Sequence, residues 1–222
     1  MTDEPTYELF SFWRSSATYR VRVALALKGL SARERNVDLD AGEQRGADFL
    51  RVNPMGAIPA LVQAGGPTIT QSLAILEYLD ETHPQPALLP ADPVGRARVR
   101  SIAAGLTSDT HPLITPRIRR YLTTQGGFDD AAWRRWQIQW FSTGLQALEA
   151  RLGAEAQTGA YCHGDSVTMA DICLASIVAV MRVFKIEVPD IPTVDAIMAR
   201  CEAHEAFARA HPLRQAGAPR PA

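Results

Sequence analysis

Residues 57–79 form the sequence AIPALVQAGGPTITQSLAILEYL, and this stretch decides the fold. Two short apolar runs, 57–62 and 68–70, flank a Gly-Gly-Pro turn, and this pattern predicts a pair of strands. The run 72–79 is strongly helical and stops before Pro84. The stretch therefore predicts a β-β-α unit, which is a common part of small α/β domains.

The residues upstream extend this unit into a complete small domain. Residues 7–12 alternate like a strand, and residues 15–30 predict a helix that ends at Lys28-Gly29. Residues 36–39 predict a second short strand, followed by a polar loop. The predicted order is β-α-β-loop-β-β-α over roughly 80 residues, which is the outline of a small α/β domain.

A proline-rich segment separates this domain from the rest of the chain. Residues 84–93 contain four prolines, which makes them poor material for a helix or a strand. Beyond this segment the sequence predicts no strand. Its predicted helices cover about 94–122, bent near Pro112 and Pro116, and then 130–153, 168–184, 193–203 and 205–210. We therefore expect an α/β domain over 6–84 and an all-helical domain over 94–213.

Composition excludes several classes of function. Lys+Arg 23 against Asp+Glu 24 gives a net charge of -1, so nothing in the charge balance predicts a nucleic-acid or acidic-membrane partner. No stretch approaches the roughly 20 apolar residues that a membrane-spanning helix needs. The three cysteines lack CxxC or Cys/His spacing, so we expect neither a disulfide framework nor a metal site, and a reducing, cytoplasmic location.

Three local motifs each allow a structural and a functional interpretation. Pro59 marks a strand edge, or it exposes the Ile58 backbone to an extended peptide-like ligand. Ser72 caps a helix, or it helps that helix terminus to bind a ligand carboxylate. Ser15 and Ser16 cap the first helix, or they lower the pKa of a nearby thiol. Taken one at a time, the structural interpretation is sufficient for each motif.

Taken together, five motifs occur in a specific order and spacing. They are RSSATYRVRVAL at 14–25, NPMGAIPAL at 53–61, QSLAILEYL at 71–79, LLPADP at 88–93 and GDSVTMAD at 164–171. In this combination the chain resembles a cytosolic glutathione transferase of the zeta class, which contains the maleylacetoacetate and maleylpyruvate isomerases. The resemblance extends over nearly the whole chain.

The resemblance implies a fold and an activity. The fold is an α/β thioredoxin-like N-terminal domain followed by an all-α C-terminal domain that lines the acceptor-substrate site, in a homodimer that uses glutathione. The activity is the glutathione-dependent cis-trans isomerisation of a maleyl-type ketoacid, maleylacetoacetate or maleylpyruvate, in aromatic or tyrosine catabolism. Two alternatives stay open: a zeta-like transferase that conjugates small electrophiles such as α-haloacids, and a non-catalytic binding module of the same fold.

The resemblance also implies which residues bind glutathione. Gln71 and Ser72 would hold its γ-glutamyl carboxylate and amine. The backbone of Ile58, next to Pro59, would pair with the cysteinyl moiety, and Gln44 would reach towards the glycyl end.

The remaining implied roles concern the sulfur and the acceptor substrate. Ser15 matches the catalytic hydroxyl that zeta-class proteins direct at the sulfur, and Ser16 starts the helix beside it. The small dicarboxylic or electrophilic substrate is implied to contact Arg14, His111, Thr115, Arg117 and Arg182.

The match to the zeta pattern departs at three places. Ala17 stands where a cysteine commonly follows the two serines, which disfavours chemistry that needs a second thiol. Thr115 or Pro116 stands where asparagine is frequent. Val183 replaces an arginine, and Arg182 lies one place earlier, which turns a helical side chain by about 100 degrees.

Two further features predict structural roles. Thr168 as N-cap and Asp171 three residues later form a capping box, so we assign Asp171 to helix initiation and not to catalysis. Arg20 and Arg22, within the first predicted helix, are expected to serve helix packing or the surface.

Overall fold

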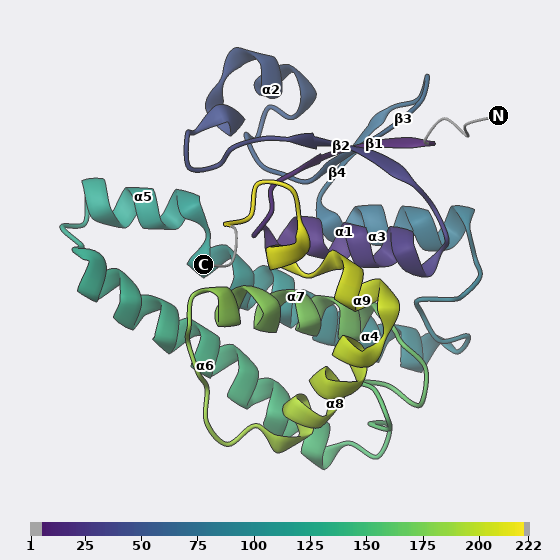
Figure 1. The fold of residues 1–222 in the computed structure, drawn as a ribbon. Helices are drawn as coiled ribbons and strands as arrows, with labels where there is room; N and C mark the ends of the chain where they lie inside the picture. Colours follow the sequence, from purple (N-terminus) through teal and green to yellow (C-terminus); the bar gives the residue numbers. More distant parts are fainter. Residues whose placement is uncertain (1–5, 220–222) are drawn as a thin grey trace. The chain divides into compact units, whose positions relative to one another are not determined.

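The computed structural model describes residues 6–219 and divides them into two compact units (Figure 1). Unit 1 comprises the described residues of Met1–Leu88 and Glu205–Ala222, and unit 2 comprises Leu89–His204. The first boundary falls inside the predicted proline-rich segment. The division differs from the predicted helical domain over 94–213 at its C-terminal end, because helix α9 (Glu205–Ala210) packs against the first helix of unit 1.

Unit 1 contains a four-stranded mixed sheet, as the thioredoxin-like prediction requires. Its strands are β1 (Tyr7–Ser11), β2 (Ala32–Asn36), β3 (Ala60–Gln63) and β4 (Thr68–Thr70), in the spatial order β2-β1-β3-β4. β1 and β2 are parallel, whereas β3 is antiparallel to both β1 and β4. A parallel pair needs a crossover connection, which helix α1 (Ser16–Leu27) supplies.

Helices cover both faces of this sheet. Along β1, Leu9 is fully buried, whereas Phe10 points to the opposite face and contacts Phe49 at a ring-centroid distance of 5.7 Å. Phe49 belongs to α2 (Ala47–Val52), while α1 and α3 (Ser72–Thr82) lie side by side on the other face (Figure 1).

In the first domain one predicted strand was wrong in position, and part of the predicted loop is helical. The second strand lies at 32–36 and not at 36–39. The charged segment ARERN forms this strand because it pairs in parallel with β1 at the edge of the sheet. An edge strand tolerates charges when they find partners: Arg35 pairs with Glu8 at 2.6 Å. The polar loop also contains secondary structure that was not predicted, namely the 3-10 turn η1 (Glu43–Arg45) and α2.

Unit 2 is all-helical, as predicted, and its first predicted helix is interrupted in the region where the bend near Pro112 and Pro116 is expected. The predicted helix over 94–122 consists of α4 (Pro93–Ala104), a π-helical turn η2 (Gly105–Thr110), a 3-10 turn η3 (His111–Ile114) and α5 (Pro116–Thr124). The interruption fits the two prolines in this segment, because proline has no N–H to continue the helical ladder. The other helices are α6 (Asp130–Ala154), α7 (Met169–Val183) and α8 (Pro192–Ala203).

The predicted capping box at the start of α7 is confirmed. Asp171 is fully buried, and its carboxylate accepts hydrogen bonds from the Thr168 N–H at 2.8 Å, the Thr168 hydroxyl at 2.8 Å and the Cys162 N–H at 2.7 Å. Burial raises the pKa of this carboxyl, although the hydrogen bonds from Cys162 and Thr168 act in the opposite direction. Asp171 therefore joins the 158–164 loop region to the helix that forms the core of unit 2.

Candidate functional site

The strand register of unit 1 collects the predicted glutathione residues at one edge of the sheet. Phe10 near the end of β1 pairs with Ala60 at the start of β3, and Ala60 pairs with Thr70 at the end of β4. The chain just after β1, just before β3 and just after β4 therefore lies at the same edge. Of the residues predicted to bind glutathione, Ile58 and Pro59 directly precede β3, and Gln71 and Ser72 directly follow β4. Ser15 and Ser16, predicted beside the sulfur, follow β1.

Ser15 occupies the N-cap position of α1. Its Oγ accepts a hydrogen bond from the Thr18 N–H at 3.1 Å, which is the structural role expected of a cap. A hydroxyl also has one proton to donate, and this cap uses only an acceptor site. Ser16 is buried as the first residue of α1. Capping and donation to a sulfur are therefore compatible functions of Ser15.

The start of α3 presents free backbone donors. Gln71 is the N-cap residue, its φ is 69°, and its side chain makes no capping hydrogen bond. The first helical bond is that of the Ile75 N–H to the Gln71 carbonyl at 3.0 Å. The N–H groups of 72–74 thus point out of the helix end, where the helix dipole also favours an anion.

Arg20 positions Ser72, a role that the sequence did not indicate. The Arg20 Nη1 donates to the Ser72 Oγ at 2.7 Å, and both side chains are buried. Because its oxygen accepts from a guanidinium, the Ser72 hydroxyl is left to donate its own proton. The available signal is an arginine among the apolar residues of α1, for which the sequence alone predicts a packing or surface role.

Gln44 lies against the loop that leads into β3. Its side chain is buried, and within residues 6–219 its Oε1 atom has no hydrogen-bond partner. Gly56 approaches its backbone closely: a Cβ built on Gly56 would lie 2.9 Å from the Gln44 carbonyl oxygen, and the Gly56 φ is +58°. Only glycine suits both conditions, so Gly56 brings Gln44 next to the segment that carries Ile58.

Asn53 fixes the shape of the same loop. Its Nδ2 donates to the Ala57 carbonyl at 2.6 Å, and its Oδ1 accepts from the Met55 N–H at 3.1 Å. The Ile58–Pro59 peptide bond is cis. Among the described residues, the backbone of Ile58 takes part in no turn, loop or strand hydrogen bond, so it is available to an extended ligand.

Arg14 already has an anionic partner. Its guanidinium donates two hydrogen bonds to the Asp40 carboxylate, from Nη1 to Oδ2 at 2.8 Å and from Nη2 to Oδ1. Its Cζ lies 5.2 Å from the ring centroid of Phe12 and 5.4 Å from that of Trp13. Arg14, one of the arginines expected to bind the acceptor substrate, is therefore paired with a carboxylate and stacked on two aromatic rings within unit 1.

In unit 2 the structure places the predicted acceptor residues in two groups. His111, Thr115 and Arg117 follow one another through η3 and the first turn of α5. Arg117 is exposed and has no ion pair with any residue of 6–219. Arg182 belongs to the last turn of α7 and forms an ion pair with Glu202 of α8. Of the two arginines, Arg117 has the free charge.

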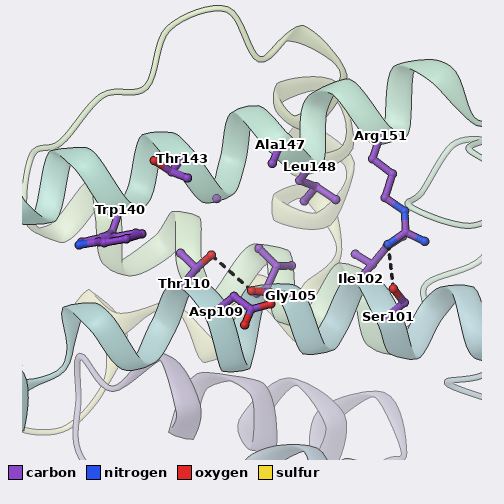
Figure 2. A pocket seen from close by; sticks show the side chains of 12 residues that line it. Ser101, Ile102, Gly105, Asp109, Thr110, Trp140, Thr143, Ala147, Leu148 and Arg151 are labelled. Atoms are coloured by element: carbon purple, nitrogen blue, oxygen red, sulfur yellow. Dashed lines mark hydrogen bonds between the residues drawn. The ribbon is translucent and has the colours of Figure 1, made fainter.

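A hollow of about 290 Å³ lies in unit 2 between α4–η2 and α6 (Figure 2). Trp140 stands at one end, and at the other the Arg151 Nη1 donates to the Ser101 Oγ at 3.0 Å. Ile102, Leu106 and Leu148 contribute apolar surface to it. None of the predicted acceptor residues lines this hollow.

Two stretches of the sequence match known family models. Residues 5–81 match the model described as "Glutathione S-transferase, N-terminal domain", and residues 143–205 match "Glutathione S-transferase, C-terminal domain".

The chain belongs to the glutathione S-transferase family.

Individual relatives of this glutathione S-transferase are similar over almost their full length. A probable maleylacetoacetate isomerase of Vibrio cholerae is 42% identical over 93% of this chain and 96% of its own. The crystal structure of maleylacetoacetate isomerase from Methylobacterium extorquens AM1, with bound malonate and glutathione, is 48% identical and superposes with a TM-score of 0.94 over 96% of this chain and 100% of its own. The holo structure of a bacterial maleylpyruvate isomerase of the zeta class gives 39%, a TM-score of 0.92 and the same coverage. The predicted family and fold are confirmed.

Glutathione fits the polar groups that unit 1 of this transferase presents. The start of α3 offers free N–H donors for a carboxylate, and the Ile58 backbone offers an unused N–H and C=O for a peptide. The buried Gln44 Oε1 lacks a donor within the described chain, which an amide N–H of glutathione would supply. Free donors and acceptors of a tripeptide thus have counterparts along one edge of the sheet.

The cysteines of this transferase do not provide a nucleophile. Cys162, Cys173 and Cys201 are all buried and free. Burial is the main cause that raises the pKa of Cys162 and Cys201, and the nearby Asp171 charge raises both further.

Residues 6–219 contain no group of three His, Cys, Asp or Glu side chains suited to a metal ion. Within the same residues, no helix is long and apolar enough to cross a bilayer.

Proposed function

We propose that this glutathione S-transferase is a glutathione-dependent cis-trans isomerase of a maleyl-type ketoacid, maleylacetoacetate or maleylpyruvate. One observation carries the proposal. The similarity to proteins named for these two activities runs through nearly the whole chain at 39–48% identity, and it includes both the glutathione side and the helical domain. Both substrate names fit a small dicarboxylic acid, and we expect the enzyme to act in aromatic or tyrosine catabolism.

We assign the glutathione side to unit 1. Gln71 and the free N–H groups after it bind the γ-glutamyl carboxylate, with Ser72 donating its hydroxyl proton. The Ile58 backbone pairs with the cysteinyl moiety, and Gln44 binds towards the glycyl end. Each assignment rests on a donor or acceptor that no described residue uses.

The chemistry needs an ionised thiol and bound carboxylates. Bound glutathione would supply a thiolate for addition to the cis double bond; the bond, single after addition, could then rotate, and loss of the thiolate would restore it as the trans double bond. Ser15 donates a hydrogen bond to the thiolate sulfur and keeps its proton, and the free N–H groups at the start of α1 add positive potential there. Arg14 and Arg117 bind the substrate carboxylates, because guanidinium groups match carboxylates in two-pronged geometry.

The assay that tests the function measures loss of the cis ketoacid with and without glutathione. We expect loss only with glutathione and formation of the trans isomer with no net thiol consumption. Net consumption of thiol with release of a leaving group from an α-haloacid, and no isomerisation, would instead identify the conjugating transferase. Failure to bind glutathione in calorimetry would identify a non-catalytic module.

Arg117→Gln is expected to raise the KM of the ketoacid about 10- to 100-fold, which is the usual effect of losing a charged hydrogen bond. The KM of glutathione should not change, because Arg117 lies in α5 of unit 2. Arg120→Gln is the matched control: it removes the same charge from the same exposed helix. Equal effects of the two substitutions would show that Arg117 acts only through the overall charge of the helix and does not contact the substrate.

We also propose that the protein is a homodimer in the cytoplasm. Met55 and Leu50 expose 65% and 37% of their surface in unit 1, while unit 2 offers a hollow with an apolar floor. A second copy that covers these surfaces would remove exposed apolar area from water. The three free cysteines are in the state that a reducing compartment maintains.

Sedimentation equilibrium is expected to give about twice the chain mass of 24.2 kDa. Met55→Asp should shift the protein towards monomer, because it would place a charge against an apolar surface. Leu213→Asp, which alters a residue that is 54% exposed in the turn η4 (Pro212–Arg214), should leave the mass unchanged. A stable monomer of the unaltered protein would refute the homodimer.

A further inference from the structure

The ion pair between Arg14 and Asp40 is two-pronged. Both terminal nitrogens of the guanidinium donate to the two carboxylate oxygens, which is the geometry in which arginine recognises carboxylates. The Arg14 side chain is 23% exposed and that of Asp40 is 57% exposed. The pair is therefore open to a competing anion from solvent.

Asp40 is presented by an ordered turn. The Asp38 Oδ1 accepts from the N–H of Asp40 at 2.8 Å and from that of Ala41 at 3.1 Å, which is the pattern of an Asx turn. The Glu43 carboxylate accepts from the Asp38 N–H at 2.7 Å, and the Glu43 N–H returns a bond to the Asp38 carbonyl at 3.0 Å. The carboxylate of Asp40 thus comes to Arg14 from a backbone that is held in place.

Arg14 does not depend on Asp40 alone for its position. The rings of Phe12 and Trp13 lie 5.2 and 5.4 Å from its Cζ, within the range of cation–π attraction. Removing the Asp40 charge would therefore leave the guanidinium stacked near Ser15 while freeing its two donors and its positive charge.

We propose that Asp40 is a specificity-determining residue that competes with the carboxylate of the acceptor substrate for the guanidinium of Arg14. This inference rests on the proposed function, in which Arg14 binds that carboxylate. Asp40 acts as an internal carboxylate: a substrate must displace it, and it returns to Arg14 when the product leaves. Asp40 therefore weakens the binding of anionic acceptors and products, and it disfavours any anion that cannot replace both hydrogen bonds.

The test is the affinity of the glutathione-saturated protein for malonate, measured by calorimetry without turnover. Asp40→Asn is expected to bind malonate about 1.5- to 5-fold more tightly, which is the range of an exposed ion pair. Its KM for the ketoacid should fall by a similar factor, with an unchanged KM for glutathione. Glu8→Gln is the matched control, because it removes one charge and breaks the Glu8–Arg35 pair on the sheet of the same unit.

A double-mutant cycle separates action through Arg14 from a general change of charge. In an Arg14→Gln background, Asp40→Asn should no longer change malonate affinity. The inference is overturned if Asp40→Asn leaves malonate affinity equal or weaker, if Glu8→Gln tightens it as much, if the effect persists without Arg14, or if neither protein binds malonate. Malonate binding is measured without catalysis. Absence of isomerase activity would therefore refute the proposed function, while the measured effect of Asp40→Asn on malonate affinity would still stand.

Discussion

Ser15→Ala is expected to slow glutathione-dependent turnover about 10- to 100-fold at a pH below the pKa of the bound thiol in both proteins. The substitution removes a hydrogen bond to an anion, worth about 1.5–3 kcal/mol, and this corresponds to a rise of about 1–2 units in the pKa of the bound thiol. The thiolate fraction, and with it the rate, falls by the same factor. Titration of the ultraviolet thiolate absorbance of bound glutathione in both proteins measures the rise directly.

Because Ser15 is also the N-cap of α1, a second variant must separate the two roles. Ser15→Asp keeps a side chain that caps helices well, but its carboxylate has no proton to donate and repels a thiolate. We expect it to be as inactive as Ser15→Ala while losing less stability. Asp129→Ala removes the cap of α6, where the Asp129 Oδ1 accepts from Ala132, and should not move the thiol pKa. An unshifted titration in Ser15→Ala would remove Ser15 from catalysis.

Asp171→Ala is expected to lower the free energy of unfolding by about 3–5 kcal/mol. It leaves two N–H groups and a hydroxyl without their acceptor, and each buried unsatisfied group costs about 1–3 kcal/mol. Urea unfolding measures the loss. Asp165→Ala is the control, since Asp165 is exposed and accepts a single bond from the Ala160 N–H. Its cost should stay near or below 1 kcal/mol.

The same variant tests the assignment of Asp171 to structure and not to catalysis. Asp171 lies in unit 2 and contacts the Cys162 loop and the α7 terminus. At low temperature, where the folded form persists, Asp171→Ala should therefore bind glutathione with unchanged affinity. A variant that is as stable as the parent but binds glutathione tenfold more weakly would contradict this assignment.

Local sequence signals predicted most elements and failed where tertiary pairing decided. The strand at 7–11, the helix after Ser15 and the capping box at Thr168 follow from alternation, apolar spacing and caps, which act between near neighbours. The strand ARERN was missed because its charges fit only an edge position beside β1. The π-helical turn before His111 was missed because a wider turn carries no simple sequence pattern.

In the candidate site, too, some residues could be predicted from the sequence, whereas their contacts with distant residues could not. Ser15, Ile58 and Gln71 could be nominated from the sequence because turn and cap chemistry places them at element ends, and the resemblance supplied a ligand for them. The partners of these residues could not be nominated, since Arg20 reaches Ser72 and Asp40 reaches Arg14 across segments far apart in the chain. No local periodicity records such contacts.

By itself the sequence determined the family, the order of the elements and the residues at the ends of strands and helices, because caps, turns and apolar periodicity are local properties of the chain. Only the tertiary structure decided the strand register that brings these ends to one edge of the sheet. It also decided the buried hydrogen bond from Arg20 to Ser72 and the pairing of Arg14 with Asp40. These depend on which distant segments pack together, and packing is a property of the whole fold.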